Sequence, residues 1–530
     1  MKRNIISLII TLFVALVSFY IFLPPLNIHY LGFWVFVMYL IMVYSLIAFT
    51  SAIGELFTTN RIKKHRTKFG FGVILSIPII IIMIMVLDFV GGPIFNAKKY
   101  ATRITIDETK TFTDDVKPVD FTKLPLLDKD SSQKLGDRVM GQMSELVSQF
   151  NVSDIYTQIN YNDKIVRVTP LDYASFIKWL TNRNEGVKGY ITVDSVTGEA
   201  SLTKLNKGMR YVPSAHFNEL LQRKLRFSYP FDCFGRISFE IDNDGNPYWI
   251  VPVISYKLIG LRAEVTDLII FNPIDGTSKK MKINEVPTWV DMAYSADLII
   301  EQVNDWGTYK QGYINSIFGQ KNVVNTTEGY NYLAMNDDIY LYTGITSIVS
   351  DESNLGFILT NMRTKETSFY SAPGAEEYSA MASAEGAVQQ MKYTSTFPLL
   401  INLNNKPTYL VSLKDAAGLV KMYGFVDVAD YQKVVVTDSS KGIEVAAKNY
   451  LGDVKIEPNE KELITKTITI KTIKDATIGG NSYYFITDEE DHKYKASISV
   501  SDNLPFLKVG STIKIGFNIE SDITNIIKLY

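Results

Sequence analysis

The stretch Ile79-Ile80-Ile81-Ile82-Met83-Ile84-Met85-Val86-Leu87 is continuously apolar and lies within a longer apolar segment from about Phe69 to Val90. A helix needs about 20 apolar residues to cross the hydrocarbon core of a bilayer. In lipid every backbone N–H and C=O group must be paired within the segment, which favours a helix. The sequence therefore predicts a transmembrane helix here, with Pro78 tolerated as a kink.

Two more apolar segments precede this one in the chain. We expect residues 1–92 to form a transmembrane anchor with three spans, at about 5–24, 31–54 and 69–90. The first span could instead be a cleaved signal peptide, because it has a basic start. Its apolar run is longer than that of a usual signal peptide, and the following Pro-Pro-Leu-Asn-Ile-His is a poor cleavage site. We therefore favour a retained span.

The basic residues around the spans predict the orientation of the anchor. Lys2 and Arg3 precede the first span, five Lys and Arg residues fill 61–68, and the loop 25–30 has none. Loops rich in Lys and Arg stay on the cytoplasmic side. We therefore expect a plasma-membrane protein with a cytoplasmic N-terminus, three crossings, and residues 93–530 outside. Asp88 should lie at the outer interface.

The overall composition hides this division of the chain. Seven of the 54 Lys and Arg residues but only two of the 56 Asp and Glu residues fall in 1–92, so 93–530 carries 47 basic and 54 acidic side chains. That balance excludes a basic nucleic-acid binder. A single cysteine, Cys233, excludes a disulfide framework and a multi-thiolate metal site. The mean hydropathy of +0.05 averages an apolar head with a polar body.

The outer region begins with polar, mixed sequence. Residues 93–150 are expected to form a stalk followed by a helix over 131–150, where apolar residues recur at three- and four-residue steps. Alternating strands follow from residue 151. A helix is expected over 171–180, after a strand that stops at Pro170.

Two copies of one pattern occupy residues 151–300. The run Val193-Asp194-Ser195-Val196-Thr197-Gly198 closes a strand on a glycine turn, and Leu268-Ile269-Ile270-Phe271-Asn272-Pro273-Ile274-Asp275-Gly276-Thr277 does the same. Each copy resembles a PepSY domain, a small α+β unit with an Asp-x-x-Thr-Gly turn. The second copy departs from that pattern at Asn272-Pro273. The resemblance implies two regulatory or inhibitory protein-binding modules.

The remaining chain divides into two parts. Residues 301–445 are expected to form one mixed α+β domain with an Ala-rich helix over 375–391. Residues 461–530 show five short strands, at 465–473, 482–487, 493–500, 512–518 and 524–529, and resemble an OB-fold barrel. An oligonucleotide ligand is excluded for this barrel by its acidic turn, Asp488-Glu489-Glu490-Asp491.

The sequence predicts no catalytic residue, no cofactor and no metal site. No Gly-x-Ser-x-Gly motif occurs, and His216 and His492 have no apparent triad partners. Glu377 and Glu385 would lie roughly 12 Å apart on the Ala-rich helix, too far for a retaining glycosidase pair. The run Asp242-Asn243-Asp244-Gly245-Asn246 starts like a calcium loop, but a hairpin turn explains it better, because Val253 stands at the twelfth position.

Aromatic side chains are the candidate binding residues. Trp306, Tyr309 and Tyr313 lie close together in a glycine-containing stretch and could bind a protein or stack on sugars. The competing interpretation is that these rings fill the core, as Trp289 is expected to do.

The whole chain resembles the uncharacterised multi-span membrane proteins of Gram-positive bacteria that are sometimes labelled cell-shape-determining. We expect a non-enzymatic envelope protein that acts as a protein-binding or scaffolding module, with the lipid bilayer and other envelope proteins as partners. The alternative is a cell-wall glycan-binding protein, or a wall-acting hydrolase that uses carboxylates of the middle domain.

Overall fold

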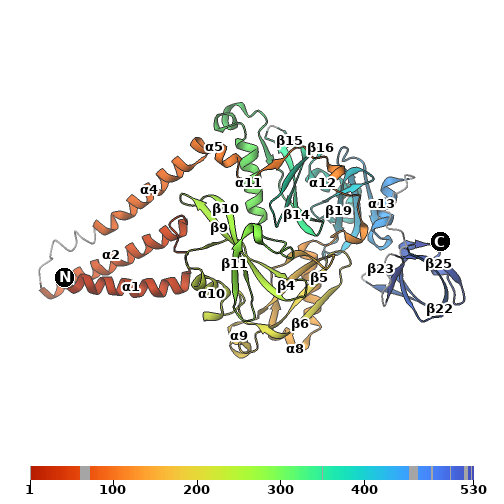
Figure 1. The fold of residues 1–530 in the computed structure, drawn as a ribbon, viewed down its shortest axis with the longest axis horizontal. Coiled ribbons are helices and arrows are strands. Elements are labelled where there is room, and N and C mark those ends of the chain that lie inside the picture. The colour runs from red at the N-terminus through yellow and green to blue at the C-terminus, as the bar shows by residue number, and fades with distance from the viewer. Residues whose placement is uncertain are drawn as a thin grey trace.

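The computed structural model describes residues 2–59, 72–348, 350–452, 464–478, 481–501, 503–517, 523–526 and 528–530. Apolar helices extend from one end of the molecule, a body of sheets and short helices occupies the middle, and a small β-unit stands at the other end (Figure 1). At this level the prediction of apolar N-terminal helices followed by a large α+β region is confirmed.

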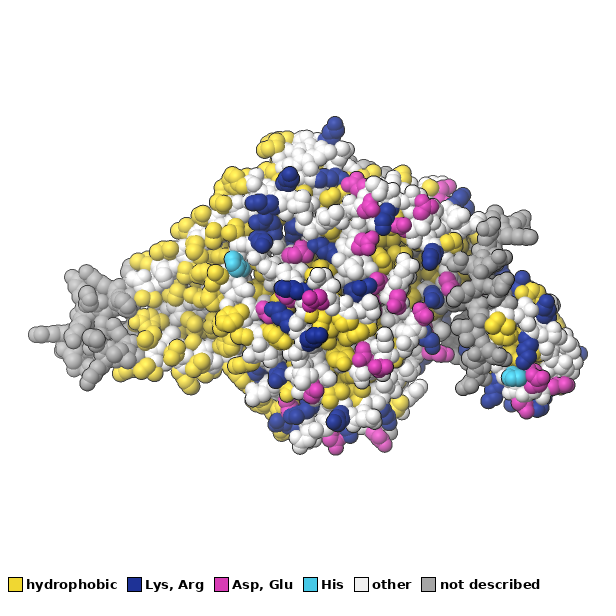
Figure 2. Space-filling view, viewed as in Figure 1, with side chains coloured by type: hydrophobic (Ala, Val, Ile, Leu, Met, Phe, Trp, Pro, Cys, Tyr) yellow, Lys and Arg dark blue, Asp and Glu magenta, His cyan; other side chains and the backbone are white. Residues whose placement is uncertain are grey.

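The N-terminal helices are α1 (Lys2–Phe22), α2 (Leu31–Thr59) and α4 (Ser76–Gly91). Two stretches, Leu31–Thr50 and Gly72–Gly91, are each 20 residues long and apolar enough to cross a membrane, and Ile6–Phe22 is a shorter apolar helix. Only 6% and 0% of the two longer stretches is buried inside the protein, so neither packs as a core helix. Hydrophobic side chains accordingly cover the described part of these helices that is visible in Figure 2. The basic segment 61–68 lies outside the described residues.

Residues 93–130, expected to form a polar stalk, are instead packed into the body. α5 (Pro93–Ala101) follows α4, and β1 (Ile106–Asp107) pairs in parallel with β16 (Thr367–Ala375). The short helices α6 (Phe112–Asp115) and η1 (Phe121–Lys123) come next. The stalk prediction followed the polar composition and missed the scattered apolar residues that are buried here, namely Ile104, Phe112, Val116, Leu124 and Leu126.

Two helices near the first sheet are shorter than expected. α7 (Lys129–Gly141) is followed by the single turn α8 (Ser144–Val147), and β2 already begins at Phe150. α9 (Phe176–Asn182) begins late because the strand before it does not stop at Pro170. That strand continues because the Pro170 carbonyl accepts the Ser153 N–H and so remains part of the sheet.

The body repeats one strand order four times. In each unit two short strands pair with the same third strand, and the fourth and fifth strands extend the sheet from the other edge of the third. The strands of unit one are β2 (Phe150–Val152), β3 (Thr157–Tyr161), β4 (Lys164–Tyr173), β5 (Val187–Asp194) and β6 (Ala200–Met209). Those of unit two are β7 (Cys233–Phe234), β8 (Ser238–Ile241), β9 (Pro247–Lys257), β10 (Leu261–Phe271) and β11 (Ser278–Lys282).

Units three and four fall within the region expected to be one mixed α+β domain. Unit three consists of β12 (Val324–Thr326), β13 (Asn331–Met335), β14 (Asp338–Ser347), β15 (Ser350–Asn361) and β16. Unit four consists of β17 (Thr394–Ser395), β18 (Leu399–Leu403), β19 (Lys406–Lys414), β20 (Val420–Asp427) and β21 (Val434–Asp438). A helix precedes each unit in the chain, and one follows the last: α7, α10 (Leu221–Ser228), α11 (Ala296–Tyr309), α12 (Glu377–Ala387) and α13 (Ile443–Leu451).

The turn between the fourth and fifth strands is built alike in all four units. The side-chain Oδ1 of one Asp or Asn accepts the backbone N–H two residues later, which is an Asx turn. The bonds join Asp194 to Val196 (2.8 Å), Asn272 to Ile274 (2.8 Å), Asn361 to Arg363 (2.9 Å) and Asp427 to Ala429 (2.9 Å). Asn272, which departs from the pattern of unit one, therefore makes the same turn as Asp194.

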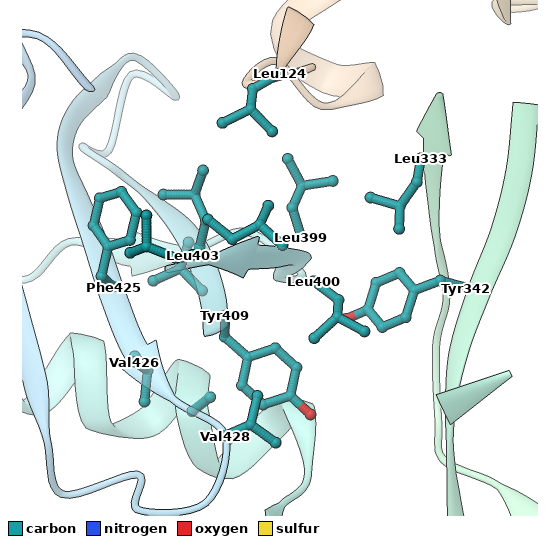
Figure 3. Packing of buried hydrophobic residues seen from close by; sticks show 14 of the residues in the cluster. Leu124, Leu333, Tyr342, Leu399, Leu400, Leu403, Tyr409, Phe425, Val426 and Val428 are labelled. Atoms are coloured by element: carbon teal, nitrogen blue, oxygen red, sulfur yellow. The ribbon is translucent and has the colours of Figure 1, made fainter. Parts of the chain in front are cut away.

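Neighbouring units share hydrophobic cores. One cluster joins units one and two, a second joins unit two to α11 and unit three, and a third joins units three and four. Strand β9 serves two of them, because Trp249 and Val251 face the first cluster and Ile250 faces the second. In the third cluster Tyr342 of β14 points toward Leu400 of β18 (Figure 3). The four units therefore form one continuous body.

The C-terminal β-unit has a separate core. Its strands are β22 (Ile464–Ile478), β23 (Asn481–Asp488), β24 (Lys493–Ser497), β25 (Thr512–Phe517), β26 (Thr524–Ile526) and β27 (Lys528–Leu529). They pair in the order β26-β24-β23-β22-β25-β27. The two edge strands of this order, β26 and β27, are close together in the chain.

Candidate functional site

The three aromatic residues singled out from the sequence are not a free surface patch. Trp306 is half-buried against the core shared by units two and three, and the Lys310 ammonium lies 3.9 Å from the centre of its ring. Tyr309 meets Tyr100 of α5 edge to face, with ring centroids 6.0 Å apart. Tyr313 is also half-buried. Trp306 and Tyr309 thus pack α11 within the body, in agreement with the competing interpretation for those two rings.

Glu377 and Glu385, the two carboxylates compared from the sequence, have separate surroundings. Glu377 is fully buried beside Gly344, and burial raises its pKa to about 7. Glu385 lies further along α12 and accepts the backbone N–H and the hydroxyl of Ser395, at 2.8 and 2.7 Å. Glu377 is therefore buried in the core, whereas Glu385 binds Ser395, and the two do not form a catalytic pair.

A cavity lies where the four units converge. The short second strands contact one another or a neighbouring strand there, β3 with β8 and β14, and β13 with β18. The cavity has a volume of about 430 Å³. Every unit contributes to its lining, with Gln158 from β3, Ser238 from β8, Tyr332 from β13, and Phe397 just before β18. We call it the junction cavity.

A buried arginine lies in the wall of the junction cavity. Arg167 of β4 is 8% exposed, and Gln158, its direct partner across the β3–β4 pairing, is 2% exposed. Val166 and Val168 face the core of units one and two, so Arg167 faces the opposite side of the sheet, toward the cavity. Within the described residues, no carboxylate lies at ion-pair distance from Arg167, its Nε has no hydrogen-bond partner, and both amide atoms of Gln158 are likewise unpaired.

The acidic residue whose charge acts most on Arg167 is already engaged elsewhere. Burial lowers the pKa of Arg167 to about 10, while the charge of Asp128 acts in the opposite direction. Asp128 accepts the Ser131 N–H at 2.9 Å, where it caps α7, and pairs with the Lys414 ammonium. Although burial opposes it, these bonds lower the pKa of Asp128. An unpaired charge inside a protein is costly, so the junction cavity is electrostatically suited to an anion.

The cavity reaches the surface. Its lining includes the exposed side chains of Lys129, Asp154 and Arg236. Arg236 faces Asp297 at 3.7 Å, which is a loose surface ion pair. Tyr330 and Tyr332 line the wall with their rings 5.6 Å apart, edge to face. The arrangement therefore combines a buried cation with an aromatic wall and a polar mouth.

Two acidic turns have structural explanations. Asp242 accepts the backbone N–H groups of Asp244 and Asn246 at 3.0 and 2.8 Å. These bonds form the hairpin turn that the sequence favoured over a calcium loop. Asp488, Glu490 and His492 bring ligand atoms within 4.8 Å of one another. Lys466 lies 3.9 Å from Asp488 and 3.6 Å from Glu490, so their charges are balanced by a lysine.

No protein-family model matches this chain, and no curated protein matches it significantly. The site therefore has to be interpreted from its own residues. Reasoning from the sequence missed Arg167, although one signal was present. A single charge between Val166 and Val168 in an apolar strand is unusual when both faces of that strand are buried. Burial of both faces follows from the packing of unit three against unit one, which no local pattern predicts.

Proposed function

We propose that this protein is an envelope protein anchored in the plasma membrane by three N-terminal helices, with residues 93–530 outside the cell as a non-enzymatic binding module. The observation that carries the proposal is the arrangement of the helices at one end of the body. The ends of α1 and α4 and the start of α2 lie against the body, and the N-terminus of α1 points away from it (Figure 1). Such an arrangement suits a single membrane plane.

Arginine side chains bind the end of α1 to the body. Arg223 and Arg226 of α10 donate from Nε to the carbonyl oxygens of Tyr20 and Leu23, at 3.1 and 3.0 Å. The last carbonyls of a helix lack internal partners and carry partial negative charge, so positive side chains stabilise them. α10 therefore holds the end of the first apolar helix.

The other two helices contact one hairpin of unit two. The Gly260 N–H donates to the carbonyl oxygen of His29, in the loop before α2, at 2.8 Å. A side chain at Gly91, the last residue of α4, would meet Leu258 and Leu261 of the same hairpin. These contacts support a fixed orientation of the body relative to the bilayer.

Charge and aromatic residues support the direction of insertion. Lys2 and Arg3 are at the end of α1 remote from the body, so the positive-inside rule directs the body outward. Phe227 of α10 packs against Phe19 of α1, with centroids 5.7 Å apart, and the Trp34 indole donates to the Ile28 carbonyl at 2.8 Å. Aromatic residues at this level suit a membrane interface.

The repeated units support a binding role. We propose that all four units are PepSY-like, extending the resemblance from 151–300 to 150–438, and that the C-terminal unit is an OB-like barrel. In that unit β22 pairs with both β23 and β25, and β24 pairs in parallel with β26, as expected of a closed five-stranded Greek-key barrel whose last strand is interrupted. The resemblance to cell-shape-determining membrane proteins then implies envelope proteins as partners.

The hydrolase alternative has less support. Glu240 accepts the backbone N–H of Asp291 at 2.8 Å and its charge acts on the Asp291 carboxyl group, but the two residues are 0% and 1% exposed. A glycosidase needs a carboxyl pair that can reach both faces of a bound sugar.

The orientation can be tested with one introduced thiol. The native Cys233 is buried, and burial raises its pKa to about 11, so it should not react in the folded protein. Val509→Cys, at a site 66% exposed in the C-terminal unit, should be labelled by an impermeant maleimide on whole cells. The matched variant Arg3→Cys should be labelled only after the cells are opened. Labelling in the reverse order would contradict the proposed topology.

The binding role can be tested by crosslinking in intact cells followed by mass spectrometry. We expect envelope proteins to be recovered on peptides from the four units or from the C-terminal unit. Recovery of no protein, together with retention of the purified chain on wall polymer, would favour the glycan-binding alternative.

A further inference from the structure

We propose that the junction cavity binds a ligand through an anionic carboxylate or phosphoryl group, with Arg167 as its counter-charge and Gln158 as its neighbouring hydrogen-bond partner. This inference assigns a ligand class to one site of the proposed binding module. It rests on the proposed function for the location of that site outside the cell. The partner proteins of the envelope remain a separate matter.

The first argument is the unpaired state of two buried polar side chains. Buried polar groups are normally hydrogen-bonded, and buried charges are normally paired. Arg167 and Gln158 lie side by side on one face of the β3–β4 hairpin, and the described residues supply neither an acid for the guanidinium nor a partner for the amide. A bound anion would satisfy both.

The second argument is the geometry of the donor. A guanidinium presents its N–H groups as a planar fork that matches the two oxygens of a carboxylate or phosphate. The Gln158 amide adds a donor and an acceptor beside that fork. Asp128 cannot take this role, since Lys414 and Ser131 already bind its two oxygens.

The third argument is the size and lining of the cavity. A volume of about 430 Å³ lies within the usual range of sites for small molecules. Tyr330, Tyr332 and Phe397 provide a wall that suits an apolar group or a ring behind the anionic head. The exposed Arg236 at the mouth adds a second positive charge along the entry path.

The location gives the ligand a structural consequence. Residues from all four units line the junction cavity, so a bound molecule lies among all four units. A ligand that binds only the folded state stabilises it in proportion to the logarithm of its concentration above its Kd. Binding of a ligand in the junction cavity should therefore raise the unfolding midpoint of the whole body.

The test uses the full chain in detergent micelles and measures the midpoint of thermal unfolding. The probes are inorganic phosphate and acetate, each compared with chloride at equal ionic strength, so that the phosphoryl and carboxylate arms are separated. We expect at least one probe to raise the midpoint of the wild type. Arg167→Gln should need at least about ten times more probe for the same rise in the midpoint, because the charged hydrogen bonds to the anion are lost. Arg138→Gln, which changes an exposed arginine outside the cavity lining, should retain most of the response.

A second readout separates ligand binding from a structural role. Without any probe, Arg167→Gln should unfold at the wild-type midpoint or above, because it removes a buried charge that has no partner. A large fall in the midpoint would mean that Arg167 holds the fold together, and would overturn the inference. Equal responses of the wild type and Arg167→Gln to both probes would also overturn it. If the unfolding test fails while the thiol labelling gives the expected result, the anion site is wrong and the proposed topology still holds. If the labelling fails while the unfolding test succeeds, only the topology is wrong.

Discussion

At the scale of single residues, Glu240 and Asp291 form a buried carboxyl pair that should store a proton. Glu240 accepts bonds from Asp291 N–H (2.8 Å), Met292 N–H (3.1 Å) and the Ser238 hydroxyl (3.0 Å), whereas Oδ1 of Asp291 has no partner. Burial raises the pKa of Glu240 to about 7, and burial together with the charge of Glu240 raises the pKa of Asp291 well above its usual range. The bonds to Glu240 favour its charged form, so we assign the proton to Asp291.

This pair should make stability depend on pH. A carboxyl group whose pKa is higher in the folded state binds its proton more tightly there, so its contribution to the unfolding free energy is full below about pH 4 and is lost as the pH rises through the folded-state pKa, which is about 7 for Glu240. From pH 5 to pH 8 we expect the wild type to lose on the order of 3 kcal/mol through this pair, measured by urea unfolding in detergent. Asp291→Asn should remove the share due to Asp291, because an amide carries no titrating proton.

A matched variant controls for a general effect of charge. Asp163, with its side chain 85% exposed, stands at a left-handed turn position that suits asparagine equally well. Asp163→Asn should leave the pH dependence unchanged. Glu240 and Glu377, each with a pKa raised by burial, should account for the dependence that remains in Asp291→Asn. An unchanged slope in Asp291→Asn would show that the proton is bound elsewhere.

At the scale of elements, the packing of α11 on unit three depends on one glycine. A Cβ at Gly307 would overlap the backbone carbonyl oxygen of Val324 in β12. We expect Gly307→Ala to lower the unfolding free energy by about 1–3 kcal/mol, because the helix must move off the sheet. In α12, Gly386 is exposed and a Cβ there would meet no atom within 4 Å. Gly386→Ala should stabilise by up to about 1 kcal/mol, and equal effects of the two changes would contradict the argument.

Local patterns predicted some elements well and others poorly, for physical reasons. The Ala-rich helix expected over 375–391 appears as α12 and the short η5 (Gln389–Met391), because propensity and first-turn acids act within one segment. All five strands expected in 461–530 have counterparts, because strand patterns also act within one segment. The fourfold repetition was only half detected, since units three and four carry Asn361 and Asp427 in turns without the Thr-Gly ending. Pairing of two short strands with one long strand is non-local, and so is the burial of Arg167.

At the scale of the whole molecule, α10 should couple the apolar helices to the body. Arg226 donates to the carbonyl oxygens of Leu23 (3.0 Å) and Asp232 (2.6 Å), and the nearby Leu26 N–H donates to the Pro230 carbonyl at 2.8 Å. Arg226→Ala leaves these carbonyls without a charged donor. We expect amide exchange around Leu26 to accelerate by at least about tenfold in hydrogen–deuterium exchange of the micelle-bound chain. Arg236→Ala, which changes an exposed arginine, should have no such effect.

The C-terminal unit should behave as a separate folding unit at the far end from the apolar helices. Ile468, Ile486, Tyr494 and Phe517 form a core of their own, and within the described residues its main contact with the body joins β23 to η6 (Ser439–Lys441). Its strands pair with one another and not with a strand of the body within the described residues. We therefore expect residues 461–530 alone to unfold cooperatively.

Deleting residues 461–530 tests the same independence from the other side. The unfolding midpoint of the remaining chain should shift by less than about 2 °C, because almost no buried apolar surface is exposed by the deletion. Its response to phosphate or acetate should be unchanged, since every residue of the junction cavity lies before residue 400. A large fall in the midpoint would mean that the body depends on the C-terminal unit. With both parts independent, crosslinked partners can be assigned to one or the other by comparing the full and shortened chains.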